Sequence, residues 1–293
     1  MNSTGAMGTA WWPTSCRVCR RWQWGVLCAS CLNNVGLSAL RCTRCALRLP
    51  GQVRPGDDDD GLCQACRDAP PGFDHATAVL DYCEPWSGLI ASLKFREDTA
   101  MAGVLARLML PALARRWHLP PPVLAAAQTG RRSPGRSSPS RIDKPRWKRG
   151  APSAIVPVPL SASRLRERGY NQAGLLAGHL GRHLHLPVWH DALIRRKDTP
   201  RLMTLDADAR LEHIRQAFAV SARHMPLLQG RHVAVVDDVL TTGATLNEVA
   251  HTLWQAGARE VSVWVAARTP APQDDAVNSD TQDKRQRGAC DLG

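Results

Sequence analysis

The amino-acid sequence predicts an α/β domain with a parallel sheet, preceded by a small module that metal holds together. From residue 154 onward, short apolar strands alternate with amphipathic helices, which is typical of a parallel sheet covered by helices on both faces. Before that domain, residues 16–66 contain eight cysteines and few apolar runs. The hydrophobic core that such a segment can form is too small to stabilise it, so we expect metal binding to stabilise it instead.

Length and composition set the class of protein. The 293 residues are enough for one α/β domain of ordinary size and a small module. The N-terminus has no signal-peptide pattern and no segment approaches the ~20 apolar residues that span a bilayer, so we expect a cytoplasmic protein without membrane insertion. Cysteines in that compartment favour metal sites over disulfides. The net charge of +12 indicates an anionic partner, although residues 129–150 alone carry +7.

The cysteines form four CxxC pairs: Cys16/Cys19, Cys28/Cys31, Cys42/Cys45 and Cys63/Cys66. Each CxxC turn places two thiolates on one side of a tight knuckle, and two knuckles complete a tetrahedral site that suits Zn²⁺. Pairing in sequence order predicts two structural zinc sites, although a crossed pairing is also compatible with the spacing. A thioredoxin-like redox motif and an iron–sulfur cluster are the competing interpretations.

The expected elements follow in chain order. A strand at 75–82 and helices at 86–96 and 99–117 come first, and later strands are expected at 155–160, 233–236 and 261–266 with helices at 171–184 and 246–256. The intervening segment, 119–152, is basic and of low complexity, which predicts a disordered insertion. The predicted organisation is therefore a flexible N-terminus at 1–15, a double ribbon at 16–70, the α/β domain at 71–270 and a disordered tail at 271–293.

The most specific segment places two acids directly after a buried strand. Asp237 and Asp238 follow the strand at 233–236, and a loop of small residues leads from them into a helix. Ligands of open α/β sheets bind beyond the carboxyl ends of strands, where backbone N–H groups and a helix N-terminus can hold a phosphate. Helix capping alone would explain Thr245 or one carboxylate, but not two adjacent acids. The absence of Gly-Lys-Ser/Thr and of GxGxxG argues against a P-loop and a dinucleotide site.

This segment resembles the signature of type I phosphoribosyltransferases that binds phosphoribosyl pyrophosphate (PRPP). The resemblance implies that Asp237 and Asp238 hold the ribose hydroxyls of PRPP. It also implies that the 5′-phosphate is held by the following loop, namely Thr241, Thr242, Gly243, Ala244 and Thr245. Mg²⁺ would accompany PRPP, bound mainly through the oxygens of that substrate.

A second anion-binding segment is expected after the strand at 155–160. Arg164, Arg166 and Arg168 come at every second position, and guanidinium groups suit pyrophosphate, although a solvated helix start would also carry such residues. The stretch VPVPL…RGYNQ at 156–172 resembles that of the bacterial ComF family, in which it occupies the place of the pyrophosphate loop. We therefore nominate Arg164, Arg168 and Gly169 for this role. The resemblance covers residues 16–118 and 154–268 and implies a type I phosphoribosyltransferase fold preceded by a double zinc ribbon.

The ComF resemblance implies a PRPP-binding protein that handles internalised single-stranded DNA in competent bacteria, with DNA-uptake proteins as partners. Zinc ribbons often bind nucleic acids, and the basic insertion would add a salt-sensitive attraction to DNA. The alternative is an active phosphoribosyltransferase with an unknown acceptor, in which positioning and electrostatic stabilisation drive displacement at the anomeric carbon. A third interpretation is a ribbon adaptor with a relic transferase domain. No catalytic residue is assigned.

Overall fold

The computed structural model describes residues 14–23, 26–33, 39–49, 61–117, 150–197 and 216–271. The basic insertion predicted at 119–152 lies outside these residues except for its last three positions, as do the predicted tail beyond residue 271 and almost all of the predicted N-terminal segment. Within the described ranges, no helix combines the length and the apolar character needed to cross a membrane.

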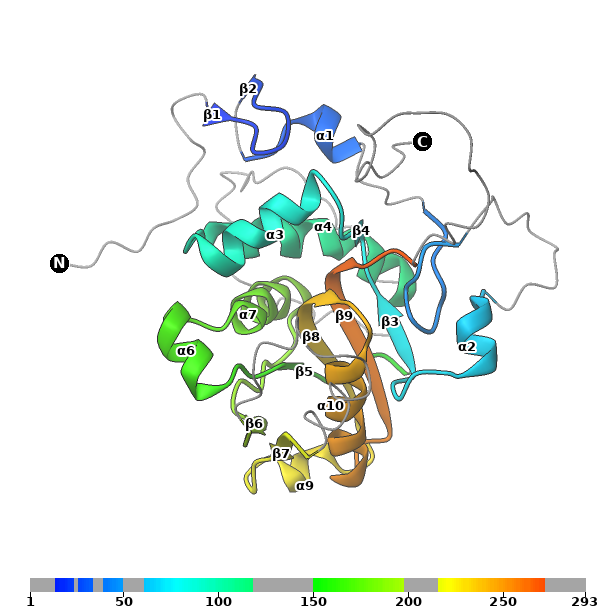
Figure 1. Ribbon diagram of the computed structural model, residues 1–293. Helices are drawn as coiled ribbons and strands as arrows, with labels where there is room; N and C mark the ends of the chain where they lie inside the picture. Colours follow the sequence, from blue (N-terminus) through cyan, green and yellow to red (C-terminus); the bar gives the residue numbers. More distant parts are fainter. Residues whose placement is uncertain are drawn as a thin grey trace, which may run out of the picture.

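The predicted parallel sheet is the centre of the fold (Figure 1). Its strand order is β3-β9-β8-β5, and every neighbouring pair is parallel. The bounds are β3 His75–Thr77, β5 Ala154–Pro157, β8 His232–Leu240 and β9 Glu260–Arg268. The strand expected at 75–82 is interrupted after Thr77. A second short strand, β4 (Leu80–Asp81), then resumes the pairing with β9 in the same register.

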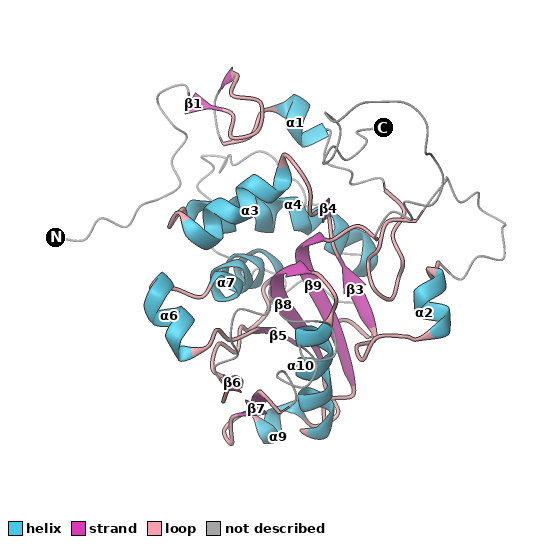
Figure 2. Ribbon diagram, viewed as in Figure 1, coloured by secondary structure: helices cyan, strands magenta, loops and turns pink. Residues whose placement is uncertain are grey.

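Helices cover both faces of the sheet, as predicted (Figure 2). One face packs against α3 (Trp86–Phe95), α4 (Ala100–Trp117) and α7 (Gln172–Leu184), and the other packs against α10 (Ala244–Gln255). Side chains of a strand point alternately to the two faces. On β8, Ala234 and Val236 therefore join the core under α3, α4 and α7, whereas Val233 and Val235 join the core under α10.

Smaller elements lie around this sheet. Helix α6 (Ala162–Arg168) follows β5, and an antiparallel pair, β6 (Leu193–Arg195) and β7 (Phe218–Val220), lies with α9 (Met225–Leu228) on the α10 side. The N-terminal module contains β1 (Thr14–Ser15), β2 (Trp22–Gln23), α1 (Ala29–Asn33) and α2 (Gln64–Asp68). Its first part lies beside α3, where Arg17 forms an ion pair of 3.2 Å with Asp98.

Strand β8 is longer than the sequence pattern predicts. Its expected end was Val236, but pairing with β9 continues to Leu240, opposite Arg268. The reason is that β9 is itself nine residues long and that Val239 and Leu240 are buried. Asp237 and Asp238 therefore lie inside the strand, rather than in the loop after it.

Candidate functional site

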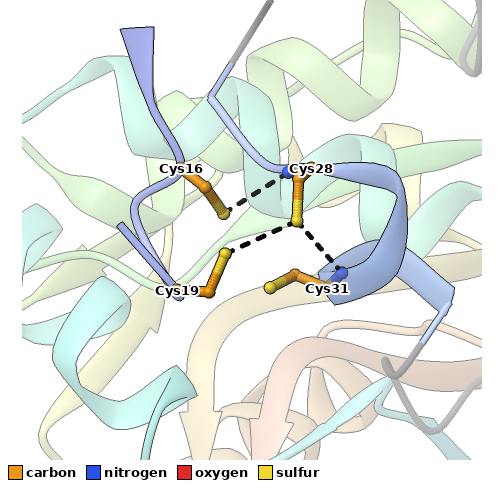
Figure 3. Close-up of side chains that lie close together, drawn as sticks. All are labelled: Cys16, Cys19, Cys28 and Cys31. Atoms are coloured by element: carbon orange, nitrogen blue, oxygen red, sulfur yellow. Dashed lines mark hydrogen bonds between the residues drawn. The ribbon is translucent and has the colours of Figure 1, made fainter. Parts of the chain in front are cut away.

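The eight cysteines of the CxxC pairs gather into two groups of four. One group contains Cys16, Cys19, Cys28 and Cys31 (Figure 3), and the other contains Cys42, Cys45, Cys63 and Cys66; in each, the four Sγ atoms lie within 4.8 Å of one another. CxxC units that are neighbours in the sequence therefore form each group, which is the sequential pairing and not the crossed one. Each group offers four sulfur ligands, which is the donor set of a closed structural metal site.

Backbone amides support the sulfur atoms of the first group. The N–H of Cys28 donates to Cys16 Sγ at 3.4 Å, and the N–H of Cys31 donates to Cys28 Sγ at 3.4 Å. Burial alone would raise the pKa of Cys16, but the backbone N–H groups of Cys19 and Cys28 lower it to about 6. Burial and the neighbouring sulfurs instead raise the pKa of Cys31 to about 12. A metal ion bound here would therefore displace protons, as thiolate sites require.

The second cysteine group is docked on the edge of the sheet. Arg41, beside Cys42, forms a mostly buried ion pair with Asp81 of β4 at 2.8 Å. Arg48 reaches the other oxygen of Asp81 at 3.4 Å. From the sheet side, Nε of Arg268 donates to the carbonyl oxygen of Cys45 at 3.1 Å. The CxxC turn of Cys42 and Cys45 and the end of β9 are therefore in direct contact.

The two acids of β8 occupy different environments. Asp238 continues the alternation of Ala234 and Val236 toward α3 and is only 3% exposed, whereas Asp237 points to the opposite face and is partly exposed. Burial, reinforced by the charge of Asp238, raises the pKa of Asp237 to about 7. Asp237 is thus the acid that a ligand can reach directly.

Asp238 is paired with a lysine of α3. Nζ of Lys94 lies 2.9 Å from Asp238 Oδ1, and both side chains are largely buried. Burial alone would lower the pKa of Lys94, but the negative charge of Asp238 raises it overall. The second oxygen, Asp238 Oδ2, is buried and has no hydrogen-bond partner among the described residues. The pair joins α3 to the carboxyl-terminal part of β8.

The loop after β8 leads through a glycine turn into the N-terminus of α10. Gly243 caps α10 with φ of +86°, a conformation that favours glycine, and no side chain caps this helix. Thr242 Oγ1 accepts a long hydrogen bond of 3.5 Å from Ala244 N. The N–H groups of Thr245 and Leu246 donate to no acceptor in the described part of the chain. Free amides at a helix N-terminus attract anions.

The predicted pyrophosphate segment forms α6 and the turn after it. Arg164 and Arg168 lie one helical turn apart, and Arg168 stacks on Phe95 of α3 with its Cζ atom 5.1 Å from the ring centroid. Gly169 ends α6 in the left-handed conformation, with φ of +74°. The hydroxyl of Tyr170 donates to the carbonyl oxygen of Leu93. This stretch therefore anchors α6 to α3, and no direct hydrogen bond or ion pair within the described ranges joins its arginines to the acids of β8.

Two residues of the site were missed by sequence reasoning. Neither Lys94 nor Arg268 is among the candidate residues that the sequence predicts. The signal for Lys94 was a lone cation in the last turn of an otherwise apolar helix, and Arg268 stands at the end of an apolar strand. Neither pattern predicts the partner, because Asp238, the partner of Lys94, and Cys45, the partner of Arg268, are distant in the sequence.

Comparison with known proteins identifies relatives along most of the chain. The family model described as a phosphoribosyl transferase domain matches residues 176–286. The DNA utilization protein YhgH of Escherichia coli K12 is 32% identical over 261 residues, covering 88% of this chain and 98% of the relative. Competence protein F of Haemophilus influenzae is 35% identical over 210 residues, covering 70% and 78%.

Two further similarities cover smaller parts. Competence protein ComFC of Bacillus subtilis is 36% identical over 119 residues, which are 39% of this chain and 44% of the relative. Among solved structures, a glutamine PRPP amidotransferase from B. subtilis is 20% identical with a TM-score of 0.27, covering 39% of this chain and 22% of its own. That TM-score is too low to support any conclusion.

Proposed function

Because the chain belongs to the ComF family, we propose that it binds PRPP at the functional end of β8 and acts in the handling of internalised single-stranded DNA. The observation that carries the PRPP assignment is the continuous arrangement of acids, loop and helix at 237–245. A partly exposed carboxylate precedes a glycine-containing turn, and the amides of Thr245 and Leu246 are free to receive a phosphate. The name of the Escherichia relative, DNA utilization protein, supports the role with DNA, and the name of the Haemophilus relative, competence protein F, supports the link to competence.

Each site residue has a proposed task. Asp237 accepts hydrogen bonds from the ribose diol, while Asp238 and Lys94 keep the strand end in place. Residues Thr241–Thr245 hold the 5′-phosphate, and the segment with Arg164, Arg168 and Gly169 is proposed to face the pyrophosphate. When bound with PRPP, Mg²⁺ would neutralise pyrophosphate charge through the oxygens of PRPP.

The cysteine groups are proposed to bind structural Zn²⁺. Four sulfurs within 4.8 Å of one another, backed by N–H donors in both groups, leave no coordination position for substrate. We further propose a cytoplasmic location, where PRPP and internalised DNA are both available and free thiols persist.

Calorimetry with PRPP and Mg²⁺ tests the ligand assignment. We expect Asp237→Asn to weaken PRPP binding roughly tenfold or more, because a hydrogen bond to a charged group is lost. Asp191→Asn is the matched control, since Asp191 is an exposed carboxylate paired with Arg223 outside the site. Wild-type protein that binds no PRPP would contradict the proposal.

The alternative function is catalysis of phosphoribosyl transfer to an acceptor. The phosphoribosyl transferase domain match favours it, and the free amides around Thr245 could stabilise the position of the substrate during pyrophosphate departure. Release of pyrophosphate from PRPP in the presence of candidate bases, dependent on Asp237, is the measurement that would favour it over binding alone.

A further inference from the structure

Arg268 joins two parts of the molecule that the sequence separates by more than two hundred residues. Its Nη1 group donates to the carbonyl oxygens of Leu240 and Thr269, each at 3.0 Å, and to that of Thr241. Its Nε group donates to the carbonyl oxygen of Cys45 at 3.1 Å. One guanidinium therefore contacts both the first residue of the phosphate loop and a cysteine of the second group.

Both ends of this bridge belong to segments with a defined conformation. Thr241 starts the turn whose glycine and free amides form the proposed phosphate cradle. Cys45 lies in a knuckle closed by backbone hydrogen bonds from Ala46 N to Cys42 O at 2.8 Å and from Cys42 N to Leu47 O at 2.7 Å. The direction of the Cys45 carbonyl depends on that knuckle, so Arg268 can transmit the state of the knuckle to the loop.

We propose that Arg268 is a positioning residue through which the second cysteine group, when it holds a metal ion, sets the conformation of the phosphate loop. The proposal rests on PRPP binding at that loop. A guanidinium is a planar fork whose donors keep fixed relative directions, so the bond to Cys45 restricts where the donors to Leu240 and Thr241 can point. A lysine carries the same charge but cannot hold both sides in one geometry.

The proposal makes the two cysteine groups unequal. Metal closes a cysteine knuckle, and loss of metal releases it. Release of the second group would free the Nε side of Arg268 and loosen the loop, which lowers affinity for a phosphate ligand. In the described part of the chain, no hydrogen bond joins the first group to residues 241–245. Linkage is reciprocal, so PRPP should slow metal loss from the second group alone.

The first experiment compares Arg268→Lys with Arg48→Ala in full-length, zinc-loaded protein. Arg48 belongs to the same knuckle and pairs with Asp81, but it does not contact the phosphate loop. By calorimetry with PRPP and Mg²⁺, we expect Arg268→Lys to bind roughly 5- to 30-fold more weakly than wild type, and Arg48→Ala to change affinity by less than about twofold. Zinc content and thermal unfolding of each variant establish that it is folded.

A double-mutant cycle separates positioning from simple destabilisation. Cys66→Ser removes one sulfur of the second group and keeps the Cys45 carbonyl that accepts from Arg268, and Cys28→Ser opens the first group as its control. We expect Cys66→Ser to weaken PRPP binding in the wild-type background, and to add little in the Arg268→Lys background. No hydrogen bond in the described part of the chain joins the first group to residues 241–245, so the effect of Cys28→Ser on PRPP affinity should be the same in the wild-type and Arg268→Lys backgrounds.

Metal release provides a readout that needs no cysteine variant. A chelator with a colour change should remove the zinc ions of the wild type in two phases, and saturating PRPP should slow one phase severalfold. In Arg268→Lys, PRPP should slow neither phase. Wild-type protein that fails to bind PRPP would refute the proposed function. Wild-type binding matched by Arg268→Lys, additive effects of Cys66→Ser and Arg268→Lys, or PRPP protection that survives in Arg268→Lys would each refute the positioning role.

Discussion

At the scale of single residues, Asp237 makes stability depend on pH. Its pKa is about 7 in the folded protein, because of burial and the nearby Asp238, whereas an unfolded chain has the ordinary value of 3.8. The folded state therefore holds a proton that the unfolded state releases, so the free energy of unfolding should fall as pH rises from about 4 to about 7. The slope cannot exceed about 1.4 kcal/mol per pH unit for one proton.

Urea denaturation across this pH range checks the expectation, with Asp237→Asn as the comparison. The variant has no titrating group at this position, so its stability should lack this component of the slope. Identical pH profiles for wild type and variant would show that Asp237 is ionised throughout the range.

The pair of Lys94 and Asp238 is a second residue-scale prediction. A buried charge without its partner is far more costly than the pair itself is stabilising. We expect Lys94→Met to lower the free energy of unfolding by about 3 kcal/mol, because it leaves Asp238 uncompensated beneath α3. Adding Asp238→Asn should restore most of the loss. Equal instability of the single and double variants, measured in urea, would mean that packing and not charge holds this contact.

The same pair shows what the sequence could and could not reveal. The adjacent acids after a buried strand predicted a ligand-binding strand end, since that combination is uncommon outside such sites. Their unequal burial was not predictable, because it depends on the helix that covers each face. Only the packing of α3 shows that Asp238 meets Lys94, while Asp237 faces the other way.

At the scale of elements, helix α7 packs closely at one of its glycines. A Cβ on Gly181 would lie 2.4 Å from Val188 Cγ2 and 3.0 Å from the carbonyl oxygen of Leu186, whereas a Cβ on Gly178 would meet nothing within 4 Å. We expect Gly181→Ala to destabilise the protein by about 1–3 kcal/mol through overpacking. Gly178→Ala, one turn earlier, should stabilise it by up to about 1 kcal/mol through helix propensity.

Thermal unfolding of the two variants measures this difference directly. Opposite shifts of the unfolding temperature are expected from the same chemical change in the same helix. Shifts of equal sign and size would show that the turn after α7 relaxes freely around the added methyl group.

Element boundaries followed local patterns only in part. Periodic apolar residues predicted the helices that became α4 and α7, because burial of one helix face repeats every three to four residues. The end of β8 was predicted four residues too early, since charged side chains suggested a loop. Pairing with a nine-residue β9 kept Asp237 and Asp238 in the strand, and a partner strand is invisible in local sequence.

At the scale of the whole molecule, the cysteine module and the α/β domain are linked more closely than their compositions suggest. The sequence predicted two modules, and the structure shows both cysteine groups as expected. It also shows contacts between them, from Arg41 to Asp81 and from Arg268 to Cys45. Arginines are common on protein surfaces, so no sequence pattern distinguished these two from solvated ones. The two modules are therefore joined by direct contacts of partly buried side chains.

The basic segment at 129–149 carries more than half of the net charge of the molecule, and the last prediction concerns its effect on DNA binding. It carries a net +7 of the total +12, so it should dominate attraction to single-stranded DNA if the chain binds that ligand. Each phosphate contact contributes about 0.7 to the dependence of log affinity on log salt for single strands. Deleting the segment should therefore weaken binding of a labelled oligothymidine at low salt and reduce this slope by up to about 5.

Fluorescence anisotropy at several salt concentrations measures both quantities, and calorimetry with PRPP on the same deletion variant gives the control. The proposed phosphate cradle belongs to β8 and α10, outside the deleted segment, so PRPP affinity should stay within about twofold of wild type. A second variant with the eight basic residues of 129–149 replaced by glutamine keeps the length and removes the charge, and it should behave like the deletion. If DNA affinity and salt dependence survive in both variants, the DNA-binding charge lies in the folded modules instead, and the segment serves only as a connection between α4 and β5.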